Sequence, residues 1–97
     1  MASLMEIQEM MQRLYFHSDF KRGAERTFSW LKEEINELGE AMEGTDREAL
    51  KSEFADVIAW IASLANLLRI DLERAVLEKY PDRCPKCNLS PCGCSFR

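Results

Sequence analysis

Apolar side chains recur at helical spacing through the stretch from 45 to 69, and this feature does most to limit what the chain can fold into. On a helix with about 100° per residue they gather into one broad arc. The arc contains Phe54, Val57, Ile58, Trp60, Ile61, Leu64, Leu67 and Leu68. No window shows the sustained alternation with β-branched residues that indicates strands. The stretch therefore predicts a long helix, N-capped by Thr45, in an all-α fold.

The same periodicity predicts three further helices, over 4–20, 27–42 and 71–80. Thr27 and Asp71 are the expected N-caps of the second helix and the last, because short polar side chains favour that position. Gly44 and Pro81 are expected to end helices. Together these segments predict a four-helix, bundle-like domain over residues 1–83.

The chain is short, and its size bears on assembly. Its 97 residues form at most one domain, and a lone core of this size would be marginally stable. The predicted long helix also carries Ala55, Ala59 and Ala62 opposite its main apolar arc, which favours cover by a partner subunit. We therefore expect a homodimer or a dimer of dimers.

Charge and hydropathy argue against several classes of partner. With 13 basic and 17 acidic residues the net charge is −4, which disfavours binding to a nucleic-acid backbone. The longest uncharged run, 57–68, is shorter than the roughly 20 residues of a membrane span. The N-terminus lacks the basic and apolar regions of a secretory signal. We expect a cytoplasmic protein with no membrane partner.

Two acids intrude on the core face of the predicted long helix. Glu53 lies inside the apolar arc, at roughly 300° when Leu50 is set to zero, and Asp56 lies on its border. A carboxylate among core positions costs several kcal/mol unless it is paired, hydrogen-bonded or bound to a cation. Glu53 and Asp56 are therefore candidates for more than surface charge.

The helix over 27–42 supplies a second pair, Glu34 and Glu37, at the edge of its apolar face, whereas Glu33 turns further toward solvent. The few basic residues on the two helices cannot neutralise all of these acids. Converging carboxylates favour a divalent ion, and Mg²⁺ prefers oxygen ligands that it shares with substrate phosphates. A satisfied polar core or an exposed acidic face is the alternative. We interpret four acids as Mg²⁺ ligands, namely Glu34, Glu37, Glu53 and Asp56.

The ordered acids form E-E-x-x-E at 33–37 and, after a gap of 15 residues, E-x-x-D at 53–56. This pattern resembles the signature of the MazG-type nucleoside triphosphate pyrophosphohydrolases, in the all-α NTP pyrophosphatase superfamily, and the resemblance extends over 4–83. It implies hydrolysis of a nucleoside triphosphate to the monophosphate and pyrophosphate, in nucleotide-pool sanitation, with Mg²⁺ or Mn²⁺ as cofactor. By position it implies that Glu34, Glu37, Glu53 and Asp56 are metal ligands, with Glu34 and Glu37 acting in catalysis. Glu33 matches the first Glu of the catalytic motif, and the resemblance leaves open whether it orients or deprotonates the attacking water.

The resemblance further suggests substrate-binding residues outside the acids. Lys79 and Arg83 stand where the family places cations against the phosphates, although the helix dipole alone also favours a cation in a last turn. Nucleobase contacts are expected from the first helix and the start of the second. The candidates are Phe16, His17, Asp19, Arg22 and Trp30. An aromatic residue at helical spacing is also an ordinary core residue, and that alternative stays open.

All four cysteines of the chain fall within the tail 84–97, as Cys84-x2-Cys87-x4-Cys92-x-Cys94. Four thiolates are enough to hold one tetrahedral Zn²⁺. Disulfides are the alternative, which a reducing compartment disfavours. A site closed by four protein ligands is structural, so the predicted zinc knuckle orders the C-terminus and does not catalyse.

Two other functions fit the same residues. A zinc-containing helical adaptor would use the acids as a charged docking face for a partner protein, without catalysis. A pyrophosphohydrolase of a phosphoribosyl-linked nucleotide would keep the fold and change the substrate. The sequence alone does not distinguish the base, the sugar, or a damaged nucleotide from a normal one.

Overall fold

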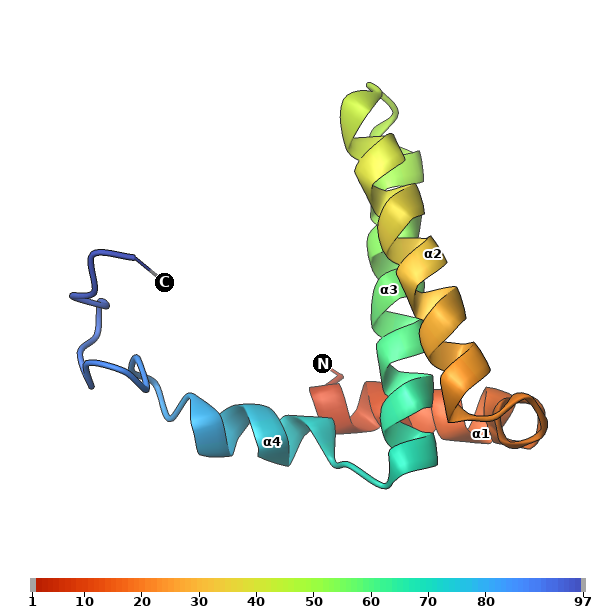
Figure 1. Ribbon diagram of the computed structural model, residues 1–97, viewed down its shortest axis with the longest axis horizontal. Helices are drawn as coiled ribbons and strands as arrows, with labels where there is room; N and C mark the ends of the chain where they lie inside the picture. The colour runs from red at the N-terminus through yellow and green to blue at the C-terminus, as the bar shows by residue number, and fades with distance from the viewer. Residues whose placement is uncertain (1, 97) are drawn as a thin grey trace.

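The computed structural model describes residues 2–96, and within them the chain is all helical (Figure 1). Its four helices are α1 (Leu4–Arg22), α2 (Ala24–Glu43), α3 (Arg47–Leu68) and α4 (Leu72–Lys79). No strand occurs in this described part of the chain. None of the described helices combines the length and apolar character needed to cross a bilayer. The predicted all-α fold with four helices is confirmed.

The start of α2 differs from the prediction, and the reason lies in its first turn. Gly23 adopts a φ of 86°, so α1 can end and α2 can begin without an intervening loop. The prediction of Thr27 as the N-cap is wrong. Thr27 lies inside the helix, is fully buried, and donates from its hydroxyl to the Gly23 carbonyl at 2.8 Å.

The N-cap of α3 differs from the predicted residue by one position, whereas the N-cap of α4 is the predicted residue. Asp46, and not Thr45, caps α3, because the Asp46 carboxylate accepts from two backbone amides of the first turn at 3.0 and 3.1 Å. Asp71 caps α4 as predicted and accepts from the Arg74 amide at 3.0 Å. Both caps satisfy amides that have no partner within the helix.

α2 and α3 form an antiparallel pair, and α1 lies across the base of that pair (Figure 1). A buried polar contact joins α1 to the end of α3: the Gln8 amide donates to Asn66 Oδ1 at 3.0 Å and to the Ile70 carbonyl at 2.7 Å. Gln8 Oε1 also accepts from the Leu72 amide at 2.9 Å. Because these groups satisfy one another, the contact is structural and holds α1 against both α3 and the start of α4.

The molecule is open, and one chain has little core. α4 and the tail after it extend away from the α2–α3 pair (Figure 1). The radius of gyration is 15.7 Å, against about 12.5 Å for a compact chain of this length. The accessible surface is 7740 Å², against about 5,700 Å² for an ordinary monomer of this mass. Among the described residues, the buried hydrophobic side chains are Leu31, Ala62 and Ala65.

Candidate functional site

Glu34 and Glu37 lie one turn apart on α2, and Glu53 comes to them from α3. Carboxylate oxygens of these three residues all lie within 4.8 Å of one another. The antiparallel turn explains the meeting, because Glu37 stands seven residues before Gly44 and Glu53 seven residues after Asp46. The structure thus brings together three of the four acids that the sequence suggests as metal ligands; they are called the acidic cluster below.

The acidic cluster is partly buried, and none of the ion pairs among residues 2–96 involves it. Oε2 of Glu34 and Oε2 of Glu53 are buried and have no hydrogen-bond partner. The ion pairs in the described chain involve other acids: Asp19 with Arg22, Glu48 with Lys51, and Glu78 with Arg74. The carboxylates are therefore crowded here without a cation from the described part of the chain to compensate them.

The electrostatics of the acidic cluster follow from this crowding. Burial raises the pKa of Glu34 from 4.5 to about 7, and the carboxylates of Glu37, Asp56 and Glu53 add to the rise. Burial likewise raises the pKa of Glu53, with Glu37 and Asp56 as the next causes. Asp56 thus lies close enough to act on both residues. A bound cation would reverse these shifts by stabilising the ionised carboxylates.

The donor set fits a hard divalent cation. Mg²⁺ takes oxygen ligands, keeps several of its waters and needs only a few carboxylates. The acidic cluster, with the half-buried Asp56 beside it, supplies such ligands. The two carboxylate oxygens that have no hydrogen-bond partner are available to bind the ion. Glu33 is different: it is exposed on α2 and is not part of the acidic cluster.

A pocket of about 330 Å³ adjoins the acids between α1 and α3. Its lining residues are Tyr15, Ser18, Asp19, Arg22, Asp56, Ala59, Trp60 and Ser63. The volume is at the lower end of the range of about 300–1,000 Å³ that small-molecule sites occupy. Asp56 belongs to the pocket wall and also acts on the acidic cluster, so the pocket and the acids are neighbours.

Asp19, which lines this pocket, has one carboxylate oxygen without a hydrogen-bond partner among the described residues. The residue is 2% exposed; its Oδ1 pairs with the Arg22 guanidinium, and its Oδ2 has no partner. Arg22 Nε donates to Thr27 Oγ1 at 3.1 Å, and its guanidinium lies over the Trp60 ring, 4.7 Å from the centroid. Trp30 stacks on Trp60 with 6.4 Å between ring centroids. The three long helices therefore hold Asp19 and Arg22 in place.

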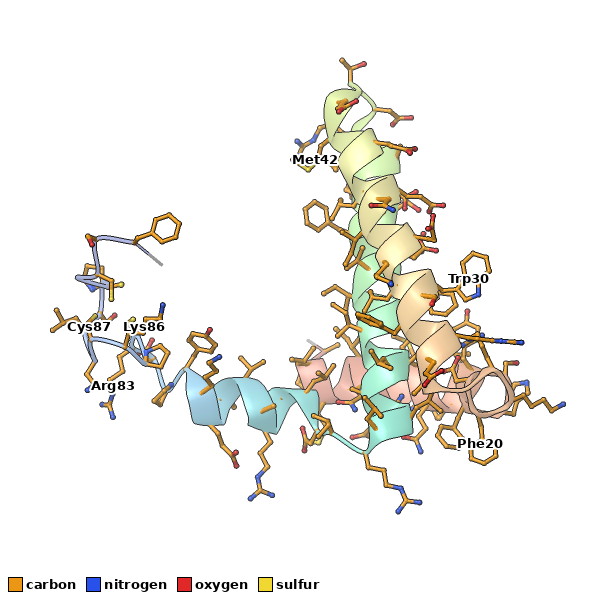
Figure 2. The ribbon with its side chains drawn as sticks, in the orientation of Figure 1. Phe20, Trp30, Met42, Arg83, Lys86 and Cys87 are labelled. Atoms are coloured by element: carbon orange, nitrogen blue, oxygen red, sulfur yellow. The ribbon has the colours of Figure 1, made fainter. Side chains whose placement is uncertain are left out.

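The remaining residues suggested for the substrate lie elsewhere. His17 is exposed and does not line the pocket, and Phe16 packs against Phe20 with ring centroids 6.0 Å apart. Lys79 ends α4 and Arg83 follows it, on the limb that extends away from the α2–α3 pair (Figure 2). Within one chain, neither of these two cations is brought to the acids.

Five residues that line the pocket are not predicted from the sequence as substrate contacts: Tyr15, Ser18, Ala59, Trp60 and Ser63. The spacing contains a signal for one of them. Trp60 follows Asp56 by four residues, which places the two side chains on the same face of a helix. Because Trp60 is apolar, the sequence pattern indicates only a core residue at this position.

The four cysteines also come together in the C-terminal tail, where Figure 2 labels Cys87. One Sγ atom from each of Cys84, Cys87, Cys92 and Cys94 lies within 4.8 Å of the others, and all four thiols are free. Amides of Cys87 and Lys86 lower the pKa of the Cys84 thiol to about 6. The Cys92 sulfur is the largest cause that raises the pKa of Cys94 to about 12.

Comparison with known protein families gives a match over most of the chain. The sequence family of the MazG nucleotide pyrophosphohydrolase domain matches residues 22–88. The matched range includes α2, α3, α4 and the acidic cluster. A search of curated proteins gives no significant match. Because the matched range is well over half of the chain, the protein belongs to the MazG nucleotide pyrophosphohydrolase domain family.

Proposed function

We propose that this protein hydrolyses a nucleoside triphosphate to the monophosphate and pyrophosphate, with Mg²⁺ or Mn²⁺ held by the acids of α2 and α3. The observation that carries this function is the acidic cluster of Glu34, Glu37 and Glu53, which has two buried oxygens without a partner. A protein keeps such a cluster at a cost in stability unless a cation compensates it. Family membership supports the reaction class, and nucleotide-pool sanitation is the cellular role we infer from it.

The acids take different roles in this proposal. Glu34, Glu37, Glu53 and Asp56 bind the divalent ion, which on binding neutralises triphosphate charge and lowers the pKa of water. The exposed Glu33, next to Glu34, orients or deprotonates the attacking water. Water cleaves the anhydride bond between the α and β phosphates, and the two products leave. In such a reaction the protein positions the substrate and stabilises charge, and its side chains do little covalent chemistry.

The pocket between α1 and α3 is the proposed site of the nucleobase. It reaches the metal-binding acids through Asp56, and Trp60 forms an aromatic part of its wall. The unused Oδ2 of Asp19 can only accept a hydrogen bond while the carboxylate is ionised. The pocket therefore favours a base that presents an N–H donor at its edge. Arg22 pairs with Oδ1 of Asp19 and leaves Oδ2 for this proposed contact.

We also propose that a second copy of the chain covers an apolar face of α2 and α3. The residues of this face are 43–67% exposed: Phe28, Ile35, Met42, Phe54 and Ile58. The surface exceeds that of a compact monomer by about 2,000 Å² per chain, an amount that an obligate homodimer interface can bury. A homodimer, or a dimer of dimers, would remove this exposed surface from water.

A second copy also offers Lys79 and Arg83 a substrate role. Both residues lie on the limb that extends away from their own acids (Figure 2). In the proposed dimer, that limb would approach the acids of the other chain, where the two cations would meet the phosphates of the substrate. Mixing a Glu37→Gln chain with an Arg83→Ala chain tests this arrangement. Activity regained in the mixed dimer supports it, and a mixture as inactive as its parents contradicts it.

A pyrophosphate-release screen tests the proposed function. Ordinary and modified nucleoside triphosphates are incubated with Mg²⁺, with Mn²⁺ or with EDTA. We expect pyrophosphate and monophosphate in equal amounts, only when metal is present. Turnover of a phosphoribosyl-linked nucleotide in place of every triphosphate would change the substrate class. Absence of turnover and of Mg²⁺ binding would reject the enzyme and favour the adaptor.

A further inference from the structure

We infer that the C-terminal segment carries a structural zinc site, in which the thiolates of Cys84, Cys87, Cys92 and Cys94 hold one Zn²⁺. This site is separate from the acidic cluster and does not depend on the proposed hydrolysis. The family match ends at residue 88. It therefore includes the first two cysteines and leaves out the other two, so the site extends past the end of the matched domain.

The sulfur positions fit a tetrahedron. With Zn–S bonds of about 2.3 Å, a regular tetrahedron separates its sulfur atoms by about 3.8 Å. Sγ of Cys84 lies 3.9 Å from that of Cys94, and Sγ of Cys87 lies 4.0 Å from that of Cys92. Disulfide sulfurs, by contrast, stand about 2.0 Å apart. The four atoms therefore surround a common centre and are not paired into two bonds.

Backbone amides support the sulfur atoms. The Gly93 amide donates to Cys87 Sγ at 3.3 Å, and the Cys94 amide donates to Cys92 Sγ at 3.2 Å. Hydrogen bonds of this kind orient metal ligands and stabilise the thiolate form that binds the ion. Both members of one close sulfur pair, Cys87 and Cys92, are thus prepared for ligation by the turn around Gly93.

Little else holds this segment in its conformation. Residues 80–96 contain no helix or strand, and the large side chains Leu89 and Phe96 are 54% and 87% exposed. Ordering a backbone costs about 1–2 kcal/mol per residue, and burial of apolar surface is too small here to offset it. A metal that binds only the folded segment supplies the missing stabilisation.

Zinc is the metal that this ligand set favours. Four soft thiolates in a closed tetrahedral arrangement are typical of structural zinc, whereas Mg²⁺ takes oxygen ligands. With no ligand position open to a substrate, this ion orders the tail and does not catalyse. It also fixes Arg83, which precedes the first ligand, and Lys86, which lies in the loop between the first two (Figure 2).

The test uses the full-length protein, purified with a reductant and without added metal. Its metal content is measured by elemental mass spectrometry, and the metal is then exchanged for Co²⁺ for absorption spectroscopy. We expect one zinc per chain, and after exchange the intense visible bands of Co²⁺ held by four thiolates. A protein that carries iron, that contains two disulfides despite the reductant, or that binds neither Zn²⁺ nor Co²⁺ overturns the inference.

Substitutions identify the ligands without reference to activity. Cys94→Ser should lower zinc affinity by more than about 100-fold, since even the loss of an outer hydrogen-bonding partner costs about 10–100-fold. Ser95→Ala, at the next position, is the matched control and should keep the full zinc content. Cys94→His should restore stoichiometric zinc, because imidazole is also a zinc ligand. Equal zinc affinity in Cys94→Ser and in Ser95→Ala would contradict the assignment.

Discussion

The Asp19 carboxylate pairs with the Arg22 guanidinium one turn further along α1, and this pair uses only one of its two oxygens. A buried acceptor without a partner lowers the stability of the fold. Because Asp19 also lines the pocket that adjoins Asp56, a ligand with an N–H donor would satisfy it there. The proposed contact with the base would therefore offset a structural cost in α1.

Asp19→Asn tests that contact. We expect a rise in KM for the preferred nucleotide of roughly 10- to 100-fold, with a smaller change in kcat, because a hydrogen bond to a charged acceptor is lost. Steady-state kinetics measures both constants. Ser18→Ala, a change in the same pocket wall, is the control and should alter KM much less. An unchanged KM in Asp19→Asn would show that the pocket does not read the base.

Loss of a charged ligand should abolish turnover while the helices persist. Glu37→Gln and Asp56→Asn each keep the side-chain shape and remove one negative charge from the metal site. Pyrophosphate release should fall by about 100-fold or more, the scale expected when one electrostatic contact of the reaction is removed. Circular dichroism checks the fold, and Glu43→Gln, at the exposed end of α2, is the control. Wild-type turnover in both variants would reject the ligand assignment.

The stability of the metal-free protein should fall as the pH rises. The pKa of Glu34 is about 7 in the folded chain, against an ordinary value of 4.5, so the folded state holds this proton more tightly. The resulting contribution to stability is fully present below pH 4.5 and is lost as the pH rises through about 7. Mg²⁺ should restore stability at the upper end of this window, because it binds the ionised form.

Thermal melts in EDTA and in Mg²⁺ measure this dependence. Glu34→Gln carries no titrating group at this position, so its melting temperature in EDTA should depend less on pH over the same window. Identical pH profiles for wild type and Glu34→Gln would contradict the role of Glu34. Mg²⁺ that stabilises both proteins equally would show that the ion binds elsewhere.

A charge on the apolar face of α2 and α3 should separate the subunits. Phe54 is 55% exposed in one chain and lies in an apolar groove with Ile58 and with Met10 of α1. Phe54→Glu would place a carboxylate in the proposed dimer interface, which is costly without a partner. Light scattering coupled to size exclusion should show a monomer. Phe96→Glu, in the exposed tail, should leave the assembly intact; a wild-type monomer would contradict the proposed interface.

Local sequence determines much of this fold, because apolar spacing and capping act within a few residues. The apolar arc of 45–69 predicts α3. Asp71 is the predicted N-cap of α4, and its side chain accepts from an amide of the first turn. The local sequence does not decide whether Thr27 caps α2 or lies inside it. A threonine at the start of a helix can cap it or can be buried in its first turn, and only the packing of α1 against α2 and α3 selects the second.

The sequence by itself determined two sets of candidate metal ligands, because the spacing of the acids on each helix and of the four cysteines is a property of short segments. Only the tertiary structure decided that Glu53 meets Glu34 and Glu37, that Arg22 joins Asp19 to Trp60, and that Lys79 and Arg83 stand apart from the acids. Periodicity gives the angle of a side chain about its own helix axis. It does not say which helices face one another, and that choice depends on the burial of apolar surface between segments far apart in the chain.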